Sequence, residues 1–382
     1  MALFTIETLR NLTEIKQGPC VSIYLPTHRI PTRIEQDRLR LKNLLGKAEN
    51  SLADAGLRSP EAKAILQPAE RLLLETPFWK GQEDGLAIFL APDIFHFYPL
   101  PLAFPELMVV SERFHLKPLL ALLGTSKFYL LALSQNEVRL FQASQYSVSE
   151  MDLEGMPQSL AEALKYDDPQ KQLQFHTGTQ KITGDRAAMF HGHGVGTDDA
   201  KSNLLRFCQH LDRGLRDILR NEQAPLVVAG VDFLLPIFRE ASSYAYLLPE
   251  GVAGNPEGLS PEELQRQAWP VVESYFNQTQ RQAAAKYRQL AGTGKASHDL
   301  REILPAAYHG RVEVLFVAVG RQEWGIFDVQ RNELQRFLEA QPGAEDLLDA
   351  AAVQTMLKGG TVFSVEPEAV PDGPPIAAVF RY

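Results

Sequence analysis

In the first third of the chain, the spacing of hydrophobic and polar residues alternates between a pattern typical of strands and a pattern typical of helices. Residues 20–29 are largely apolar and β-prone, which predicts a buried strand that ends at Pro26. Residues 36–57 place apolar side chains about every 3.6 positions and stop near Gly56, which predicts a helix. The same patterns recur further on: helical over 59–77, strand-like over 85–92 and 94–100, and a strand with a short helix over 107–123. We therefore expect a first α/β domain at residues 1–124.

A second series of elements starts at residue 127, where two strand-like segments flank SQNE at 134–137, a sequence suited to a hairpin turn. Residues 150–200 are rich in Asp, Gln, Gly and Thr and have little periodicity, which indicates loops with a few short elements. Helical spacing resumes after Asp198 or Asp199, either of which is a natural N-cap. Three further elements come after this helix: a strand at 225–231 and helices at 232–242 and 261–290. We therefore predict a central α/β domain at residues 125–290.

The last part of the chain predicts a third, small α/β domain at residues 291–382. Its elements are a helix from 299 up to Pro305, a strand at 311–318, a helix at 346–360, and two strands at 361–367 and 376–382. The predicted fold class is therefore α/β, with three α/β domains in sequence.

Composition narrows the class of protein. The length of 382 residues exceeds the size at which a single core keeps growing, which agrees with several domains. The hydrophobic fraction is 45% and the charged fraction 22%, and no apolar run approaches the roughly 18 residues of a membrane span. The N-terminal residues lack the features of a secretory signal. We expect a cytoplasmic protein without membrane contact, with Cys20 and Cys208 as reduced thiols in the core.

The formal net charge of -9 argues against a protein that binds nucleic acid with its whole surface, because phosphate neutralisation requires clustered Lys and Arg. One local basic segment stands out between residues 29 and 42. It contains Arg29, Arg33, Arg38, Arg40 and Lys42, opposed by only Glu35 and Asp37. This segment is a candidate for RNA contact, and a solvated helix face is the alternative.

Five segments, taken in order, resemble the archaeal and eukaryotic class-1 translation release factors and their relative Pelota, in particular the divergent bacterial members of that family. They are VSIYLPT with RLKNLL, FHLKPLLALLGTSKFYLLALSQNEVRLFQ, HGHGVGTDDAKSNLLRF, LAGTGKASHDLREILPAAYHGRVEVLFVA, and PPIAAVFRY. The resemblance depends on their shared order along nearly the whole chain, since no single segment is specific. It implies that the central domain is ribonuclease-H-like and that the last resembles kink-turn-binding ribosomal proteins.

The third of these segments lies where the family has its catalytic loop and the helix that follows. In the release factors a Gly-Gly-Gln loop enters the ribosomal peptidyl-transferase centre and helps to place water on the peptidyl-tRNA ester. Counting back from Arg206 puts Ser202 in the position of that Gln, and Ala200 and Lys201 in those of the glycines. The resemblance therefore gives no support for hydrolysis by the family's mechanism.

Counting forward from His193 instead gives the sequence VGT, with Gly196 as its only glycine. The loop is still rich in glycine, with Gly192 and Gly194 ahead of Gly196, and its length would let it reach an extended target. Insertion into a ribosomal site without hydrolysis is therefore compatible with this sequence.

His191 and His193 have four interpretations. As a metal pair they would need a third ligand, for which Asp198 or Asp199 is available. Either imidazole has a suitable intrinsic pKa for acid or base catalysis. Both could bind RNA, or they could serve local turns of a surface loop. The sequence leaves these alternatives open.

The resemblance implies a release-factor-like protein that engages the ribosome or a tRNA-like site in termination or rescue. The expected partners are the ribosome or tRNA/rRNA, with a protein partner as a further option, and no cofactor or metal is expected. The alternative is a hydrolase or metal-dependent nuclease with His191 and His193 as catalytic residues, so enzymatic activity is left open. The candidate RNA-binding residues are Arg29, Arg33, Arg38, Arg40, Lys42, Gly192, Gly194, Gly196, Lys201 and Arg206.

Overall fold

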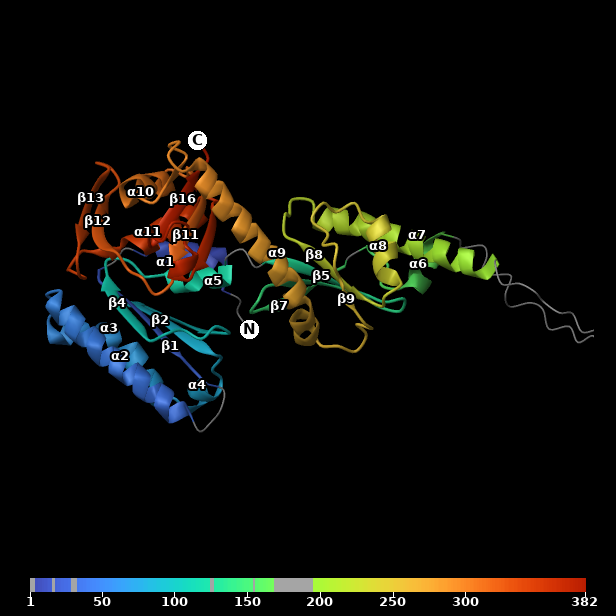
Figure 1. The fold of residues 1–382 in the computed structure, drawn as a ribbon. Helices are drawn as coiled ribbons and strands as arrows, with labels where there is room; N and C mark the ends of the chain where they lie inside the picture. Colours follow the sequence, from blue (N-terminus) through green and yellow to red (C-terminus); the bar gives the residue numbers. More distant parts are fainter. Residues whose placement is uncertain (1–3, 16–17, 29–32, 124–126, 154, 168–194) are drawn as a thin grey trace, which may run out of the picture. The chain divides into compact units, whose positions relative to one another are not determined.

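The computed structural model describes residues 4–15, 18–28, 33–123, 127–153, 155–167 and 195–382 (Figure 1). The chain divides into two compact units. One combines Met1–Ser126 with Phe276–Tyr382, and the other is Lys127–Tyr275. Helices and strands are mixed in both, as the predicted α/β class requires. Within the described residues, no helix combines the length and the apolar character needed to cross a bilayer.

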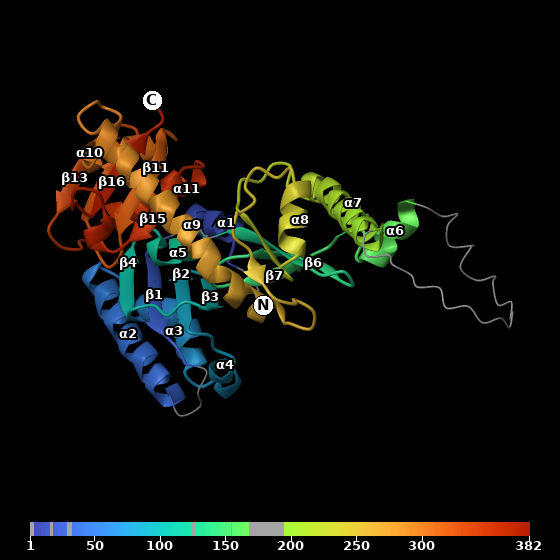
Figure 2. The ribbon, with the colours of Figure 1, turned by 45° about the vertical axis from the view of Figure 1, so that its right-hand side comes forward.

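The N-terminal part of the first unit is built on a four-stranded antiparallel sheet of order β3-β2-β1-β4. Helices α2 and α3 cover one face of this sheet (Figures 1 and 2). The elements are α1 (Ile6–Glu14), β1 (Cys20–Pro26), α2 (Ile34–Asp54), α3 (Ser59–Leu72), α4 (Thr76–Lys80), β2 (Gly85–Ala91), β3 (Ile94–Leu100), β4 (Leu107–Ser111), the 3-10 helix η2 (Lys117–Leu119) and α5 (Leu120–Leu123).

Strand β1 is a continuous apolar run because both of its faces are buried. Val21 and Ile23 pack in one hydrophobic cluster with residues of α2 and α3. Cys20 and Tyr24 point to the opposite face and belong to a second cluster. Helix α2 ends close to Gly56, whose φ of 92° is in the left-handed region that favours glycine.

The C-terminal part of the first unit has two sheets, of order β10-β16-β11-β15 and β13-β12-β14. Strands β11 and β15 are parallel, and β16 is antiparallel to its two neighbours. The elements are β10 (Ala296–Ser297), α10 (Leu300–Tyr308), β11 (Val312–Ala318), β12 (Trp324–Asp328), β13 (Glu333–Phe337), β14 (Glu345–Asp346), α11 (Leu347–Leu357), β15 (Thr361–Val365), the 3-10 helix η4 (Pro367–Ala369) and β16 (Ile376–Phe380).

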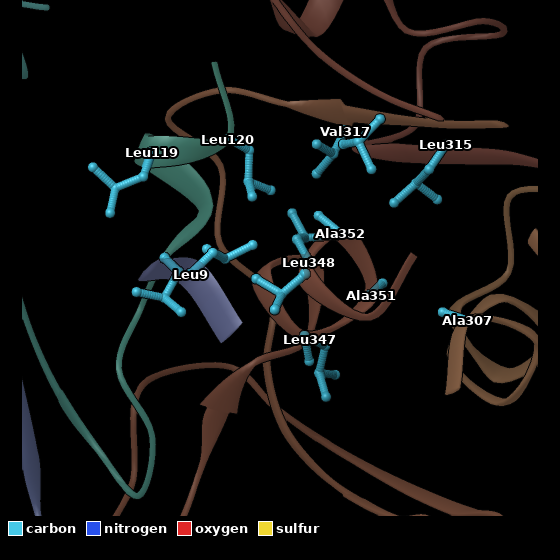
Figure 3. Close-up of a cluster of buried hydrophobic side chains, with 14 of the residues drawn as sticks. Leu9, Leu119, Leu120, Ala307, Leu315, Val317, Leu347, Leu348, Ala351 and Ala352 are labelled. Atoms are coloured by element: carbon cyan, nitrogen blue, oxygen red, sulfur yellow. The ribbon is translucent and has the colours of Figure 1, made fainter. Parts of the chain in front are cut away.

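One hydrophobic core joins the two ends of the chain within the first unit. Leu9 of α1 and Leu120 of α5 belong to the same cluster as Leu315 of β11 and Leu348 of α11. Figure 3 shows these side chains around α11, with Val317 above the helix. Segments separated by more than 170 residues therefore bury each other's apolar surface, which is the main stabilising contribution in folding.

The second unit contains a five-stranded sheet of order β7-β6-β5-β8-β9, in which β5, β6 and β7 are antiparallel and β8 and β9 run parallel to β5. Its elements are β5 (Phe128–Leu133), β6 (Val138–Ala143), β7 (Val148–Met151), α6 (Leu160–Asp167), α7 (Val195–Ile218), β8 (Leu226–Gly230), α8 (Leu234–Ala241) and β9 (Val252–Ala253). Helix α9 (Pro261–Leu290) begins in this unit and ends in the first.

Helix α7 packs on the second unit through one apolar stripe. Leu204, Phe207, Leu211 and Leu215 recur at helical spacing and are buried. Gly214 allows a close approach, since a Cβ atom at this position would lie 2.2 Å from Cγ of Met156. This packing fixes which face of α7 remains exposed to solvent.

Three elements differ from the sequence-based expectation. Helix α7 starts at Val195, so Asp198 and Asp199 lie inside the helix and are not its N-cap. Helix α10 continues through Pro305 to Tyr308, because burial of Leu304, Ala306 and Ala307 outweighs the missing hydrogen bond of proline. The hairpin of β12 and β13 was not predicted, because β13 has the sequence ELQRF, without a clear apolar alternation.

Candidate nucleic-acid interface

The predicted basic segment lies at the start of α2. Arg33 is exposed at the N-cap position, Lys42 is exposed one turn beyond Arg38, and Arg29 lies outside the described residues. Arg38 donates to Oε1 of Glu35 at 3.0 Å and to Oγ1 of Thr76 at 3.1 Å. Arg33, Arg38, Arg40 and Lys42 thus lie at or within one helix. Of these, Arg33 and Lys42 form no ion pair with the described part of the chain.

Arg40 and the buried Asp37 belong to a small polar network beside this segment. Nη1 of Arg40 is 2.9 Å from Oδ1 of Asp37, and its Nε is 3.2 Å from Oε1 of Glu106. Asp37 also accepts hydrogen bonds from the main-chain N of His28 and contacts its Nδ1, both at 2.9 Å. Asp37 therefore links the end of β1 to α2, and much of the charge of Arg40 is neutralised locally.

The central loop contains the candidates His191, Gly192, His193 and Gly194, and all four lie outside the described residues. Gly196 lies in the first turn of α7. Lys201 and Arg206 are exposed on the same helix. The described residues contain no group of three His, Cys, Asp or Glu side chains that could hold a metal ion.

An arginine stripe runs along the exposed side of α7 and extends the predicted pair Lys201 and Arg206. It comprises Arg206 and Arg213 of α7 and Arg220 in the turn just after the helix, all exposed, with Arg216 beside them. Seven residues of α-helix correspond to about 10.5 Å and nearly two full turns, so Arg206 and Arg213 share one face of α7, and Arg220 continues the series in the turn after the helix. None of the three forms an ion pair with another residue that the structure describes, whereas Arg216 pairs with Asp212 at 2.9 Å.

The sequence-based list missed Arg213 and Arg220. The sequence does carry a signal for them, because two further arginines follow Arg206 at intervals of seven, the first within a clearly amphipathic helix and the second just after its end. Guanidinium groups are well suited to phosphate because they are planar, always charged and able to donate two parallel hydrogen bonds. The arrangement can bind an extended polyanion along the helix axis.

Asp212 holds the C-terminal half of α7 in place. Its carboxylate accepts from the main-chain N of Ser243 at 2.7 Å, from Oγ of Ser243 at 2.8 Å, and from Nη2 of Arg216 at 2.9 Å. Burial alone would raise the pKa of Asp212, but these hydrogen bonds lower it below its usual value. The helix that presents the arginine stripe is thus tied to the segment after α8.

A second polar cluster lies in the first unit and is buried. Nζ of Lys117 is 2.9 Å from Oδ2 of Asp346, and Oδ1 of Asp349 accepts the main-chain N–H groups of Leu116, at 2.6 Å, and of Lys117. Nδ1 of His115 lies 3.6 Å from Oδ1 of Asp349 and has no hydrogen-bond partner among the described residues. The cluster joins the segment after β4 to the start of α11.

The ionisation of this cluster follows from its burial. Burial lowers the pKa of His115 to about 4 and, together with the nearby Asp346 carboxylate, raises that of Asp349 to about 8. His115 and Asp349 are therefore both neutral near pH 7, and their contact is not an ion pair. The adjoining cavity of about 30 Å³ has room for one water molecule, so this cluster fastens the fold and offers no substrate site.

Both cysteines are free and buried. Burial raises the pKa of Cys20 to about 11 and that of Cys208 to about 12, so neither thiol forms the reactive thiolate at neutral pH. This agrees with their prediction as core thiols and assigns them no catalytic role.

One known family matches the second compact unit of the chain. Residues 128–274 match a family model for bacterial relatives of the archaeo-eukaryotic release factors, which confirms the resemblance inferred from the sequence. The particular family is described as bacterial archaeo-eukaryotic release factor family 7. The matched range coincides with the second compact unit to within one residue at each end.

Solved structures give weaker similarities. An archaeal translation termination factor, aRF1, is 15% identical, with 99% of each chain covered and a TM-score of 0.24. Ribosome-bound archaeal Pelota, solved with ABCE1, is 11% identical over 100% of this chain and 95% of that chain, with a TM-score of 0.41. Dom34 from S. cerevisiae is 9% identical over 78% and 74%, with a TM-score of 0.33. These similarities assign no role to any residue, and no curated protein matches the chain.

Proposed function

We propose that this protein engages the ribosome or a tRNA-like site in termination or rescue of translation. The observation that carries the proposal is the release factor family match over residues 128–274. The arginine stripe of Arg206, Arg213 and Arg220 supports it, because α7 overlaps and continues the segment in the position of the family's catalytic loop and following helix. The Gly-Gly-Gln motif is absent from the sequence, so hydrolysis of peptidyl-tRNA is not part of the proposal.

The finer description of the fold belongs to this proposal. A ribonuclease-H-like central domain is supported by three antiparallel strands in hairpin order followed by two strands parallel to the first. A C-terminal domain that resembles kink-turn-binding ribosomal proteins is supported by the β10-β16-β11-β15 sheet with α10 and α11 packed on it. Boundaries at 1–124, 125–290 and 291–382 stay a prediction.

The proposed RNA contacts fall into two groups. Arg33 and Lys42 on α2 are exposed and have no acidic partner in the described structure, so they can bind phosphate without breaking an existing ion pair. The arginine stripe, on α7 and in the turn after it, provides three further groups of the same kind. The Dom34 structure is described as that of a factor that interacts with Hbs1. A protein partner for this chain is likewise a proposal.

The test is co-sedimentation of the full chain with 70S ribosomes at low and moderate salt. We expect the wild type in the ribosome pellet at low salt, with weaker binding at moderate salt because phosphate contacts release counterions. The variant Arg206→Gln/Arg213→Gln/Arg220→Gln should leave the pellet at both concentrations.

A matched control removes three exposed arginines elsewhere, Arg71→Gln/Arg288→Gln/Arg331→Gln. This control should pellet like the wild type, which separates a specific surface from the effect of net charge. If the folded wild type stays in the supernatant at both salt concentrations, the proposed function is wrong.

A further inference from the structure

The four strands of the C-terminal sheet each bring one cation to the same end of the sheet. Lys295 directly precedes β10, Arg311 directly precedes β11, Lys358 comes shortly before β15, and Arg381 directly follows β16. These ends coincide because β16 is antiparallel to β10 and β11, and β15 is parallel to β11. We call this set of four residues the cation row; it lies next to the C-terminal end of the chain marked in Figure 1.

Main-chain contacts confirm that the four residues are neighbours. The N–H of Arg381 donates to the carbonyl of Arg311 at 2.8 Å, and the N–H of Phe380 donates to the carbonyl of Lys295 at 2.9 Å. Nη2 of Arg381 donates to the carbonyl of Gly359 at 2.9 Å, next to Lys358. With adjacent strands about 4.8 Å apart, four strands place the row over about 14 Å.

The cation row has no acidic side-chain partner in the described structure, and Nη2 of Arg311 donates to the main-chain oxygen of Tyr382 at 3.4 Å. Lys295, Lys358 and Arg381 are exposed, and none of the four forms an ion pair with a described Asp or Glu side chain. The nearest carboxylate in sequence, Glu313, is 2.6 Å from Nζ of Lys286. At the opposite end of the same sheet, the residues that follow the strands include Asp299 and Glu366. The row is therefore a local positive site on an acidic chain.

Aromatic rings lie beside the row. The guanidinium carbon of Arg311 is 5.9 Å from the ring centroid of Phe380 and 5.7 Å from that of Tyr382. The Tyr382 side chain is 71% exposed, so the open face of its ring is accessible. Arg381 is held by the carbonyls at the end of α11, which orders its side chain before any ligand binds.

We propose that the cation row binds the phosphodiester backbone of single-stranded RNA, with the ring of Tyr382 stacked on a base. A row of about 14 Å spans several consecutive phosphates, which recur about every 3.4 Å along the axis of each strand in a duplex and lie further apart in an extended strand. An acidic peptide would satisfy the cations but would not use the exposed ring, whereas stacking is the usual partner of phosphate contacts in single-strand binding. This site is separate from α7, and the inference does not rest on the proposed function.

The test measures binding of a fluorescein-labelled 16-nucleotide single-stranded RNA to the full chain by fluorescence anisotropy. The variant Lys295→Gln/Lys358→Gln removes two exposed cations whose side chains form no hydrogen bond or ion pair with another described residue, so the fold is kept. We expect its affinity for RNA to fall about tenfold at 50 mM salt, and the slope of log K against log salt to fall by about 1.4, from 0.7 per lost phosphate contact. Tyr382→Ala should weaken binding about fivefold through lost stacking.

The matched control is Lys63→Gln/Lys80→Gln, which removes the same charge from exposed positions of α3 and α4. It should bind RNA like the wild type, and melting temperatures will verify that all variants are folded. If Lys295→Gln/Lys358→Gln binds RNA with wild-type affinity, the inference is wrong. It is equally wrong if a polyglutamate peptide competes as well as unlabelled RNA of the same charge, because the surface would then recognise acidic protein.

Discussion

The buried cluster around Lys117 and the arginine stripe on α7 use similar side chains for opposite purposes. Lys117 is 6% exposed and touches Asp346, and Asp349 next to it accepts two main-chain hydrogen bonds. Arg206, Arg213 and Arg220 are exposed and have no acidic partner in the described structure. A cation that is taken out of water must be compensated within the fold, whereas an exposed cation contributes little to stability and stays free for a ligand. Burial thus separates cations that hold the fold from cations that stay available to a ligand.

We expect the largest change in the free energy of unfolding from Lys117→Met. This change leaves the carboxylate of Asp346 buried without its cation, which should lower the free energy of unfolding by about 3 to 5 kcal/mol. Urea denaturation of the purified variant measures the loss. Lys201→Met on α7 is the matched control, and it should change stability by less than about 0.5 kcal/mol. Equal effects of the two changes would contradict the comparison.

The next effect is a pH dependence that comes from the same cluster. Asp349, whose pKa rises from 3.8 to about 8 on folding, keeps a proton that the unfolded chain loses, so stability falls as pH rises between these values. His115, whose pKa falls from 6.5 to about 4, has the opposite effect between those two values. The two contributions oppose each other up to pH 6.5, and only that of Asp349 remains from there to about pH 8.

We therefore expect this cluster to lower the free energy of unfolding by about 2 kcal/mol between pH 6.5 and pH 8. Asp349→Asn should remove this contribution, because the amide keeps an acceptor oxygen for Leu116 and Lys117 and does not ionise. The measurement is urea denaturation of both proteins at several pH values in this range. Parallel pH profiles of the wild type and the variant would show that Asp349 is already ionised at pH 6.5.

The smallest effect on stability is expected from the stripe itself. Arg206→Gln/Arg213→Gln/Arg220→Gln should change the free energy of unfolding by less than about 0.5 kcal/mol, because Gln is a good helix former and no ion pair with a described residue is lost. Thermal and urea denaturation check this value beside the ribosome sedimentation described above. If the free energy of unfolding fell by more than about 2 kcal/mol, the stripe would contribute to the stability of the fold as Lys117 does, and the comparison would be wrong.

Much of the fold could be predicted from local patterns. The strand at Cys20–Pro26 and the helix at Pro261–Leu290 were predicted because their apolar residues have a clear period and clear end signals. Helix α10 and the β12 hairpin show the limit, because tertiary packing decided both. Packing against a partner distant in sequence leaves no local signal.

The candidate sites also differ in how far the sequence alone reveals them. The cations of α2 and α7 are visible in the sequence as clusters or as a heptad repeat, although only Lys201 and Arg206 of α7 were selected. The pairing of Lys117 with Asp346 joins residues 229 positions apart, and no sequence spacing indicates it. The cation row likewise depends on strand order, because Lys295 and Arg381 become neighbours only when β16 pairs with β10.

The core shared by both ends of the chain has a consequence for synthesis. β16 pairs between β10 and β11, so the first unit lacks an inner strand until residues 376–380 have been made. The second unit, residues 127–275, is complete about a hundred residues earlier and can fold while its neighbour waits. During that interval the apolar side chains of α1 and β1 that belong to this core lack their partners from the C-terminal elements, so the early part of the chain is left incompletely buried until synthesis ends.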